Sequence, residues 1–247
     1  MNGNLLESWR GRVIGLGFHR RETLTAKELN AKQSFMAELS YYNSEVFNKP
    51  IIVAMIGLVG SGKTSVAKDL GAAIAATVIE GDKIRVELRK QKAPYEKTRA
   101  IAEDVAIEIT KRGGNVVIDS DFIDTNKRAS LREKVRKAGV RLAFVCTYCD
   151  LDVANGRIME ADYTDSREDF FGGASTKWEG SEQSQGVVVK LREMVRRLPL
   201  HYRWSSKGGG KWEIKKPPCF VVADIDTTDP VEWRAEVKKC AKKILAQ

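Results

Sequence analysis

The chain has few of the features that define several large classes of protein. Four cysteines and two histidines among 247 residues do not make a disulfide framework. No apolar run approaches the roughly 18 residues that a membrane span requires. The N-terminus has no cationic start followed by an apolar stretch, which a secretory signal would show. We therefore expect a cytoplasmic protein that has no membrane partner.

Positive charge is in excess. Lysine and arginine number 42 against 33 aspartates and glutamates, so the net charge is +9. Such a balance favours polyanionic partners, nucleotides included, although an ordinary solvated lysine surface has the same composition. The apolar content of 43% is enough for one large α/β domain with additions.

A phosphate-binding motif lies in the first half of the chain. Residues Gly57-Leu58-Val59-Gly60-Ser61-Gly62-Lys63-Thr64 spell G-x-x-x-x-G-K-[ST], between the apolar run 51–56 and a helix-like stretch. The glycines let backbone N–H groups turn toward an anion, and the helix start adds positive partial charge. The motif predicts ATP binding by Gly57, Gly60, Ser61, Gly62, Lys63, Thr64 and Ser65. A glycine turn without a ligand is the simpler alternative.

Strands and helices alternate from residue 50 onward. Apolar runs predict strands at 51–56, 77–80, 115–119, 140–146 and 219–223. Helices are expected at 63–75, from about 82, and at 95–112, 126–138, 151–161, 184–198 and 230–246. The alternation predicts an α/β fold of the P-loop NTPase type, with a parallel sheet of about five strands and helices on both faces.

Two parts of the chain stand outside this alternation. Residues 1–49 are expected to form an N-terminal extension, which is helical from the capping box 25–28 to about Ser44. Residues 50–247 are expected to form the P-loop domain, with 162–218 as a lid and basic insert. The insert contains an acidic loop and then Tyr202, Trp204 and Trp212 among basic residues. These aromatic rings would either stack bases or pin the insert to the core.

An acidic residue at the end of the third expected strand adds a metal-binding position to the nucleotide site. The strand 115–119 ends in Asp119, the Walker B arrangement, so Asp119 and Thr64 are the expected ligands of Mg²⁺. Motor ATPases place a glutamate next, but here Ser120 follows. The GTPase motifs D-x-x-G and N-K-x-D are also missing, since Asn126-Lys127 continues as Arg128-Ala129. Nothing is obviously built to activate water, so transfer to another acceptor is favoured.

The carboxyl end of the second strand supplies the residues for such an acceptor. Asp82 follows this strand and is a candidate base for an acceptor hydroxyl. Arg85, three residues later, is a candidate contact for an anionic group of the acceptor. The alternative is that Asp82 only caps a helix and Arg85 is a solvent-exposed side chain.

Taken together, these motifs resemble a known group of kinases. The phosphate loop, Gly81-Asp82-x-x-Arg85, Val117-Ile118-Asp119-Ser120 and Asn155-Gly156-Arg157 are similar to P-loop kinases of the AAA type. This group contains polynucleotide 5′-hydroxyl kinases, zeta-toxin-like sugar-nucleotide kinases and chloramphenicol phosphotransferases. The resemblance covers about residues 50–161, and 219–246 more weakly. It implies ATP-dependent phosphorylation of a hydroxyl group.

The resemblance also implies individual roles. Asp82 would be the general base, Arg85 an acceptor-phosphate contact and Arg157 a lid arginine on the transferring phosphoryl group, with Lys63 as the further catalytic residue. Arg167 competes for the lid role, and either arginine could instead be a surface residue. Residues 224–228 would lie near the adenine, although a helix cap at Thr228 or Asp229 is the favoured interpretation.

The sequence thus predicts an ATP- and Mg²⁺-dependent kinase whose acceptor is a nucleic-acid 5′ end, a nucleotide sugar or another small metabolite. A regulatory ATPase or switch with no acceptor is one alternative, and a nucleic-acid-binding module is another. Cys146-x-x-Cys149 is expected to be a pair of buried cysteines, because neither redox nor zinc-binding partners stand at suitable spacing.

Overall fold

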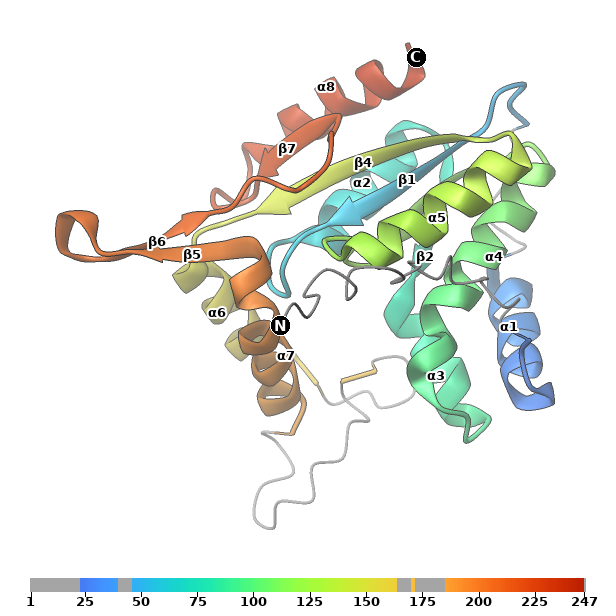
Figure 1. Cartoon of the computed structure of the whole chain (residues 1–247), viewed down its shortest axis with the longest axis horizontal. Coiled ribbons are helices and arrows are strands. Elements are labelled where there is room, and N and C mark those ends of the chain that lie inside the picture. Colours follow the sequence, from blue (N-terminus) through green and yellow to red (C-terminus); the bar gives the residue numbers. More distant parts are fainter. Residues whose placement is uncertain (1–22, 40–45, 164–169, 172–184, 247) are drawn as a thin grey trace, which may run out of the picture.

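Five parallel strands form the central sheet of the molecule (Figure 1). The computed structural model describes residues 23–39, 46–163, 170–171 and 185–246. The strand order is β2-β3-β1-β4-β7. The strands are β1 (Ile51–Ile56), β2 (Ala76–Glu80), β3 (Asn115–Asp119), β4 (Arg141–Tyr148) and β7 (Ala223–Asp226). The predicted P-loop NTPase-type parallel sheet is confirmed.

Strand β1 lies at the centre because all six of its residues are apolar and buried. Ile52 pairs with Val116 of β3 on one side and with Leu142 of β4 on the other. The chain that leaves β1 therefore emerges between two neighbouring strands, at the carboxyl edge where parallel sheets bind ligands.

Helices cover both faces of the sheet. On one face lie α2 (Lys63–Ala73) and α8 (Trp233–Leu245), which share one hydrophobic cluster with the strands. On the other face, α1 (Ala26–Leu39), α3 (Gly81–Lys90), α4 (Thr98–Lys111) and α5 (Thr125–Ala138) share a second cluster. The two layers of helices enclose the sheet, as Figure 1 shows.

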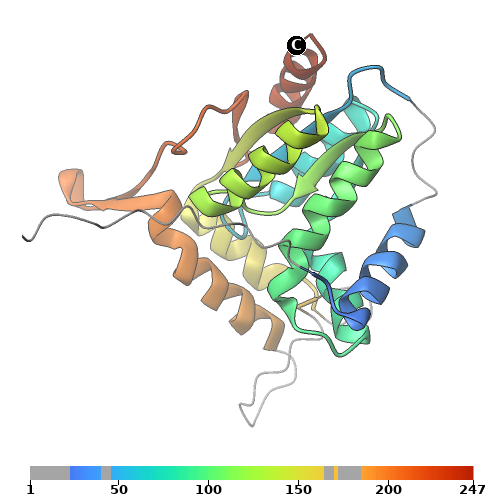
Figure 2. The ribbon, with the colours of Figure 1, turned by 45° about the vertical axis from the view of Figure 1, so that its right-hand side comes forward.

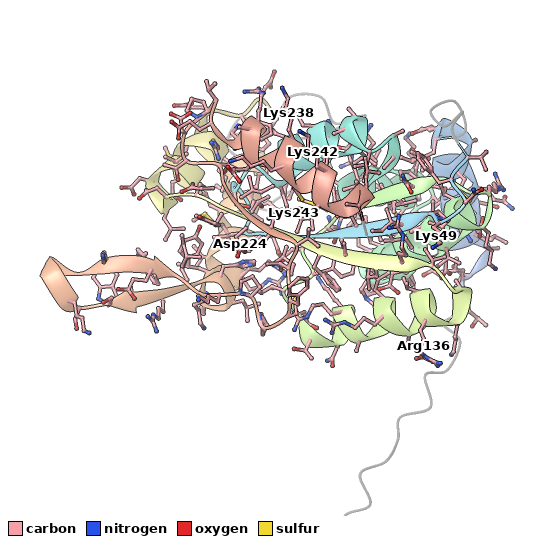
Figure 3. The ribbon with its side chains drawn as sticks, turned by 90° about the horizontal axis from the view of Figure 1, so that it is seen from above. Lys49, Arg136, Asp224, Lys238, Lys242 and Lys243 are labelled. Atoms are coloured by element: carbon pink, nitrogen blue, oxygen red, sulfur yellow. The ribbon has the colours of Figure 1, made fainter. Side chains whose placement is uncertain are left out.

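Helix α8 shows how the excess positive charge is arranged. Its buried side chains are Trp233, Val237, Cys240, Ala241 and Ile244, the three-to-four residue spacing of one helical face. Lys238, Lys242 and Lys243 are exposed and lie along the outer side of the helix (Figure 3). Part of the positive charge therefore belongs to the solvated face of an amphipathic helix.

Helices α6 (Leu151–Glu160) and α7 (Gln185–His201) pack together beyond the carboxyl edge of the sheet (Figure 2). Together with Leu58 of the phosphate loop they form a third hydrophobic cluster. No helix among the described residues is long and apolar enough to cross a membrane.

An unpredicted antiparallel hairpin follows α7 and extends from the body of the molecule (Figure 1). It consists of β5 (Tyr202–Ser205) and β6 (Lys211–Ile214), joined by a 3₁₀ turn (Lys207–Gly209). Tyr202 is buried and donates a 2.7 Å hydrogen bond to the carbonyl oxygen of Cys149, so it pins the insert to the core. Trp204 and Trp212 are exposed and pack on each other, with ring centroids 5.4 Å apart.

The expected strand at 219–223 is wrong. The last strand runs over Ala223–Asp226 and pairs with β4 from Val145 to Tyr148. Apolar residues Cys219 and Val221 instead pack, in irregular structure, against the hydrophobic cluster on the α5 side. An edge strand tolerates exposed polar residues such as Asp224 and Asp226, so hydrophobicity did not mark it.

Smaller differences concern helix starts. The closing helix begins at Trp233, not at residue 230, because the Asp229 carboxylate accepts hydrogen bonds from the N–H groups of Val231 and Glu232 and forms a turn. The expected helix 95–112 consists of a 3₁₀ turn (Tyr95–Lys97) followed by α4. The capping box is confirmed, since the N–H of Thr25 donates a 2.7 Å bond to Glu28 Oε2.

Candidate active site

The loop between β1 and α2 depends on its glycines. Gly60 and Gly62 have φ angles of 85° and 72°, a conformation that side chains disfavour. A Cβ atom on Gly60 would also lie 2.7 Å from the carbonyl oxygen of Ala154. A Cβ atom on Gly57 would lie 2.3 Å from Thr147 Oγ1. Both the turn and the close packing beneath it therefore require glycine.

A cavity of about 550 Å³ opens beside this loop at the carboxyl edge of the sheet. It brings together nearly all of the predicted site residues: Gly57, Gly60, Gly62, Lys63, Thr64, Ser65, Asp82, Arg85, Asp119 and Arg157. Ser61 is the exception, because it is buried beneath the loop and its hydroxyl lies 2.9 Å from Thr147 Oγ1. Arg167 lies outside the described residues.

Thr64 and Asp119 meet across the cavity. The Thr64 hydroxyl donates a 2.6 Å hydrogen bond to Asp119 Oδ2. Burial raises the pKa of Asp119, and the charge of Lys63 and the Thr64 hydrogen bond only partly oppose this shift. A desolvated carboxylate beside a hydroxyl fits a small divalent cation, which prefers oxygen ligands. The described residues hold no cluster of three or more metal-ligating side chains, so phosphate and water oxygens would complete the coordination.

Asp82 and Arg85 line the same cavity, from the first and second turns of α3. Arg85 donates a hydrogen bond to the Asp82 carboxylate, and the two side chains are 35% and 49% exposed respectively. The guanidinium of Arg85 also lies over the Phe170 ring, 5.4 Å from its centroid. Asp82 does not cap the helix, because Glu80 occupies the N-cap position. The carboxylate is thus placed in the cavity and stays accessible to a ligand.

Arg157 takes a structural position at the edge of the cavity. Its guanidinium donates to the carbonyl oxygen of Gly60 at 3.4 Å and to Thr227 Oγ1 at 3.0 Å, and it also bonds the Thr227 carbonyl oxygen. These contacts join α6 to the phosphate loop and to the end of β7. The expected contact of Arg157 with a transferring phosphoryl group stays a prediction.

Sequence reasoning missed Asp121, which links the phosphate loop to α7. Its Oδ1 accepts bonds from the N–H groups of Gly57 (3.3 Å) and Ile123 (3.0 Å). Its Oδ2 lies 2.8 Å from Arg197 Nε and 2.9 Å from His201 Nε2. Burial alone would raise the pKa of Asp121, but the hydrogen bond and charge of His201 and the charge of Arg197 hold it well below the usual range. Its place two residues beyond the Walker B acid was the available signal.

Lys127 was considered only as part of an absent GTPase motif. It lies in the first turn of α5, lines the cavity, and donates a 3.3 Å hydrogen bond to the carbonyl oxygen of Asp121. Burial lowers its pKa, and the charge of Arg197 lowers it further. No local sequence pattern indicates that a lysine in this helix reaches the cavity.

Comparisons with known proteins agree with the architecture. Residues 52–169 match the model of a family described as an AAA domain. A search among curated proteins found no match.

Several solved structures are similar to the chain. A candidate kinase from Chloroflexus aurantiacus is 14% identical with a TM-score of 0.51, and covers 79% of this chain and 99% of its own. The protein APE1195 is 16% identical with a TM-score of 0.51, and covers 82% and 98%. The APS kinase CysC of Mycobacterium tuberculosis, in complex with AMPPNP and APS, is 16% identical with a TM-score of 0.46, and covers 80% and 96%. The likeness to the first two shows that the chain has the P-loop NTPase fold.

Proposed function

We propose that the protein is an ATP- and Mg²⁺-dependent kinase that transfers the γ-phosphoryl group to a hydroxyl of an acceptor. One observation carries this proposal: the Asp82 carboxylate lines the same cavity as the phosphate loop and the Thr64–Asp119 pair. Phosphoryl transfer requires positioning and charge neutralisation, and this cavity offers groups for both.

The phosphate loop binds the nucleotide. The backbone N–H groups of the loop and the Lys63 ammonium bind the β- and γ-phosphates. Thr64 and Asp119 would hold Mg²⁺, which would neutralise charge on the phosphate oxygens.

Helix α3 supplies the residues that face the acceptor. Asp82 accepts the proton of the acceptor hydroxyl, whose oxygen forms a bond to the γ-phosphorus. The bond between this phosphorus and the β–γ bridging oxygen breaks, and ADP leaves with the electron pair. Arg85 orients the Asp82 carboxylate through their ion pair and contacts the acceptor. The Asp82–Arg85 pair thereby supports placing the chain in the kinase group that it resembles.

The division of the chain follows from these roles. Residues 50–247 form the kinase domain, and residues 1–49 form its extension. The insert 162–218 acts as a lid, which its α7 supports by supplying Arg197 to the cavity lining.

A transfer assay with γ-labelled ATP tests the proposal. Panels of oligonucleotides, nucleotide sugars and small alcohols serve as acceptors for the wild type and Asp82→Asn. We expect the variant to lose about 10²- to 10⁴-fold in transfer rate, since it lacks the base. Its ATP affinity should stay unchanged, because the phosphate loop is intact.

Asp152→Asn is the matched control, since Asp152 is an exposed acid in the first turn of another helix. It should transfer at the wild-type rate. Slow ATP hydrolysis that neither an acceptor nor Asp82→Asn alters would contradict the kinase and indicate a regulatory ATPase.

A further inference from the structure

The positively charged side chain of Lys127 lines the cavity. Its backbone is already satisfied, because the Asp124 carboxylate caps α5 and accepts hydrogen bonds from the N–H groups of Asn126 and Lys127. Its side chain is half-buried and reaches the carbonyl oxygen of Asp121 at 3.3 Å. The ammonium lines the cavity and takes no part in capping the helix.

This cation has no carboxylate partner in the part of the chain that the structure describes. The Asp121 carboxylate is taken by Arg197 and His201, and that of Asp124 by the backbone of α5. By contrast, Arg85 and Arg197 each pair with a carboxylate on the same lining. A half-buried ammonium that forms no direct ion pair is unfavourable, and a bound anion reduces this cost.

Lys127 lines the same cavity as Asp82 and Arg85, the residues expected to face the acceptor. Arg197 of α7 and Arg85 of α3 are the cations that act on it most strongly, and both line the cavity with it. Asp121 and Asp124 oppose them, but burial and the cations prevail and lower the pKa of Lys127. Lys127, Arg85 and Arg197 therefore line one cavity, where an anion beside the Asp82 carboxylate would meet several cations.

We propose that Lys127, together with Arg85, binds an anionic group of the acceptor, so that the substrate is a phosphorylated or similarly anionic alcohol. Arginine offers a planar fork to such a group and lysine a point charge. That the bound anion is the phosphoryl acceptor rests on the proposed kinase function. The anion site itself is tested without any transfer reaction.

The experiment measures anion binding to the full chain saturated with Mg²⁺ and AMPPNP, whose terminal phosphate fills the γ-position. Inorganic phosphate is titrated calorimetrically into the wild type, Lys127→Met and Lys127→Arg. Lys137→Met is the control, since Lys137 is an exposed lysine of the same helix that pairs with Glu133. We expect Lys127→Met to weaken phosphate binding about tenfold or more, and the other two variants to stay near the wild type.

A measurement on the wild type alone covers the case in which Lys127→Met does not fold. Reductive methylation of lysines in the AMPPNP complex is followed by mass spectrometry, with and without phosphate. Phosphate should slow the modification of Lys127 and leave that of Lys137 unchanged.

Several results would overturn the inference. They are phosphate binding of equal strength in Lys127→Met, no phosphate binding to the wild-type AMPPNP complex, and no protection of Lys127. Phosphate that binds through Lys127 with ADP but not with AMPPNP would assign Lys127 to the γ-phosphoryl group instead. Failure of the transfer assay with intact phosphate binding would refute the kinase and leave the anion site standing.

Discussion

The Thr227 hydroxyl donates a 3.0 Å hydrogen bond to the carbonyl oxygen of Ser61, across a separation of 166 residues. Thr227 is buried and directly follows β7, and Ser61 lies inside the phosphate loop. The same hydroxyl accepts a bond from Arg157. The edge strand therefore holds the loop that is expected to bind ATP.

Replacing Thr227 with valine should loosen that loop. The change keeps the shape but removes the donor to the Ser61 carbonyl and one of the three acceptors of Arg157, whose bonds to the Gly60 and Thr227 carbonyl oxygens remain. The unsatisfied Ser61 carbonyl costs about 1–3 kcal/mol of unfolding free energy. We expect weaker ATP binding, measured by calorimetry, together with a lower midpoint of thermal unfolding. Thr228→Val is the control, since Thr228 accepts a hydrogen bond only from the N–H of Asp150 among the described contacts. Equal ATP affinity in both variants would contradict the coupling.

Two glycine-to-alanine substitutions should change the free energy of unfolding in opposite directions. Gly60→Ala places a Cβ atom 2.7 Å from the Ala154 carbonyl oxygen at a φ of 85°, so strain alone costs about 1–3 kcal/mol. Gly156 lies within α6 with open space around its Cβ position, so Gly156→Ala should stabilise the helix by about 1 kcal/mol. Chemical denaturation of both variants checks this. A stable Gly60→Ala chain that binds ATP normally would refute the expected loop geometry.

Asp121→Asn should destabilise the protein. The neutral amide leaves the half-buried Arg197 guanidinium without its counter-charge, and losing one member of a buried pair costs at most about 3–5 kcal/mol. The wild-type contribution comes from a lowered pKa, so it is fully present above the unfolded-state value near 4 and is lost as the pH falls below it.

The difference in unfolding free energy between wild type and Asp121→Asn should therefore shrink below about pH 4. Urea denaturation at a series of pH values measures it. Asp224→Asn, an exposed acid on β7, is the control and should show almost no difference at any pH. A constant difference for Asp121→Asn down to the lowest accessible pH would rule out the ion pair as its source.

The four cysteines should differ sharply in reactivity. Cys219 is half-buried, whereas Cys146, Cys149 and Cys240 are buried. Burial raises the pKa of Cys240 to about 11 and also raises the pKa values of Cys146 and Cys149. Since the thiolate is the reactive form, iodoacetamide at pH 8 should label Cys219 first, as followed by mass spectrometry. In guanidinium all four should react alike, and equal rates in the native protein would contradict this burial.

Much of the fold was determined by local sequence. The glycine spacing of the phosphate loop, the apolar strands 51–56 and 115–119, and the helices after them rest on contiguous residues, so the sequence alone predicts the sheet except for its edge strand β7. The candidate site was predicted to the same extent, because Lys63, Thr64, Asp82, Arg85 and Asp119 all stand at the carboxyl ends of predicted strands, which share one edge of the sheet.

Only the tertiary structure decided the contacts between distant segments. The bonds of Asp121 to Arg197 and of Thr227 to Ser61 join residues whose separations carry no periodic signal. The position of β7 could not be predicted from the sequence either, because this edge strand is defined by its hydrogen bonds to β4 and not by continuous apolar side chains. Local propensity specifies the elements of the chain, whereas burial and charge pairing between those elements specify which side chains meet in the cavity.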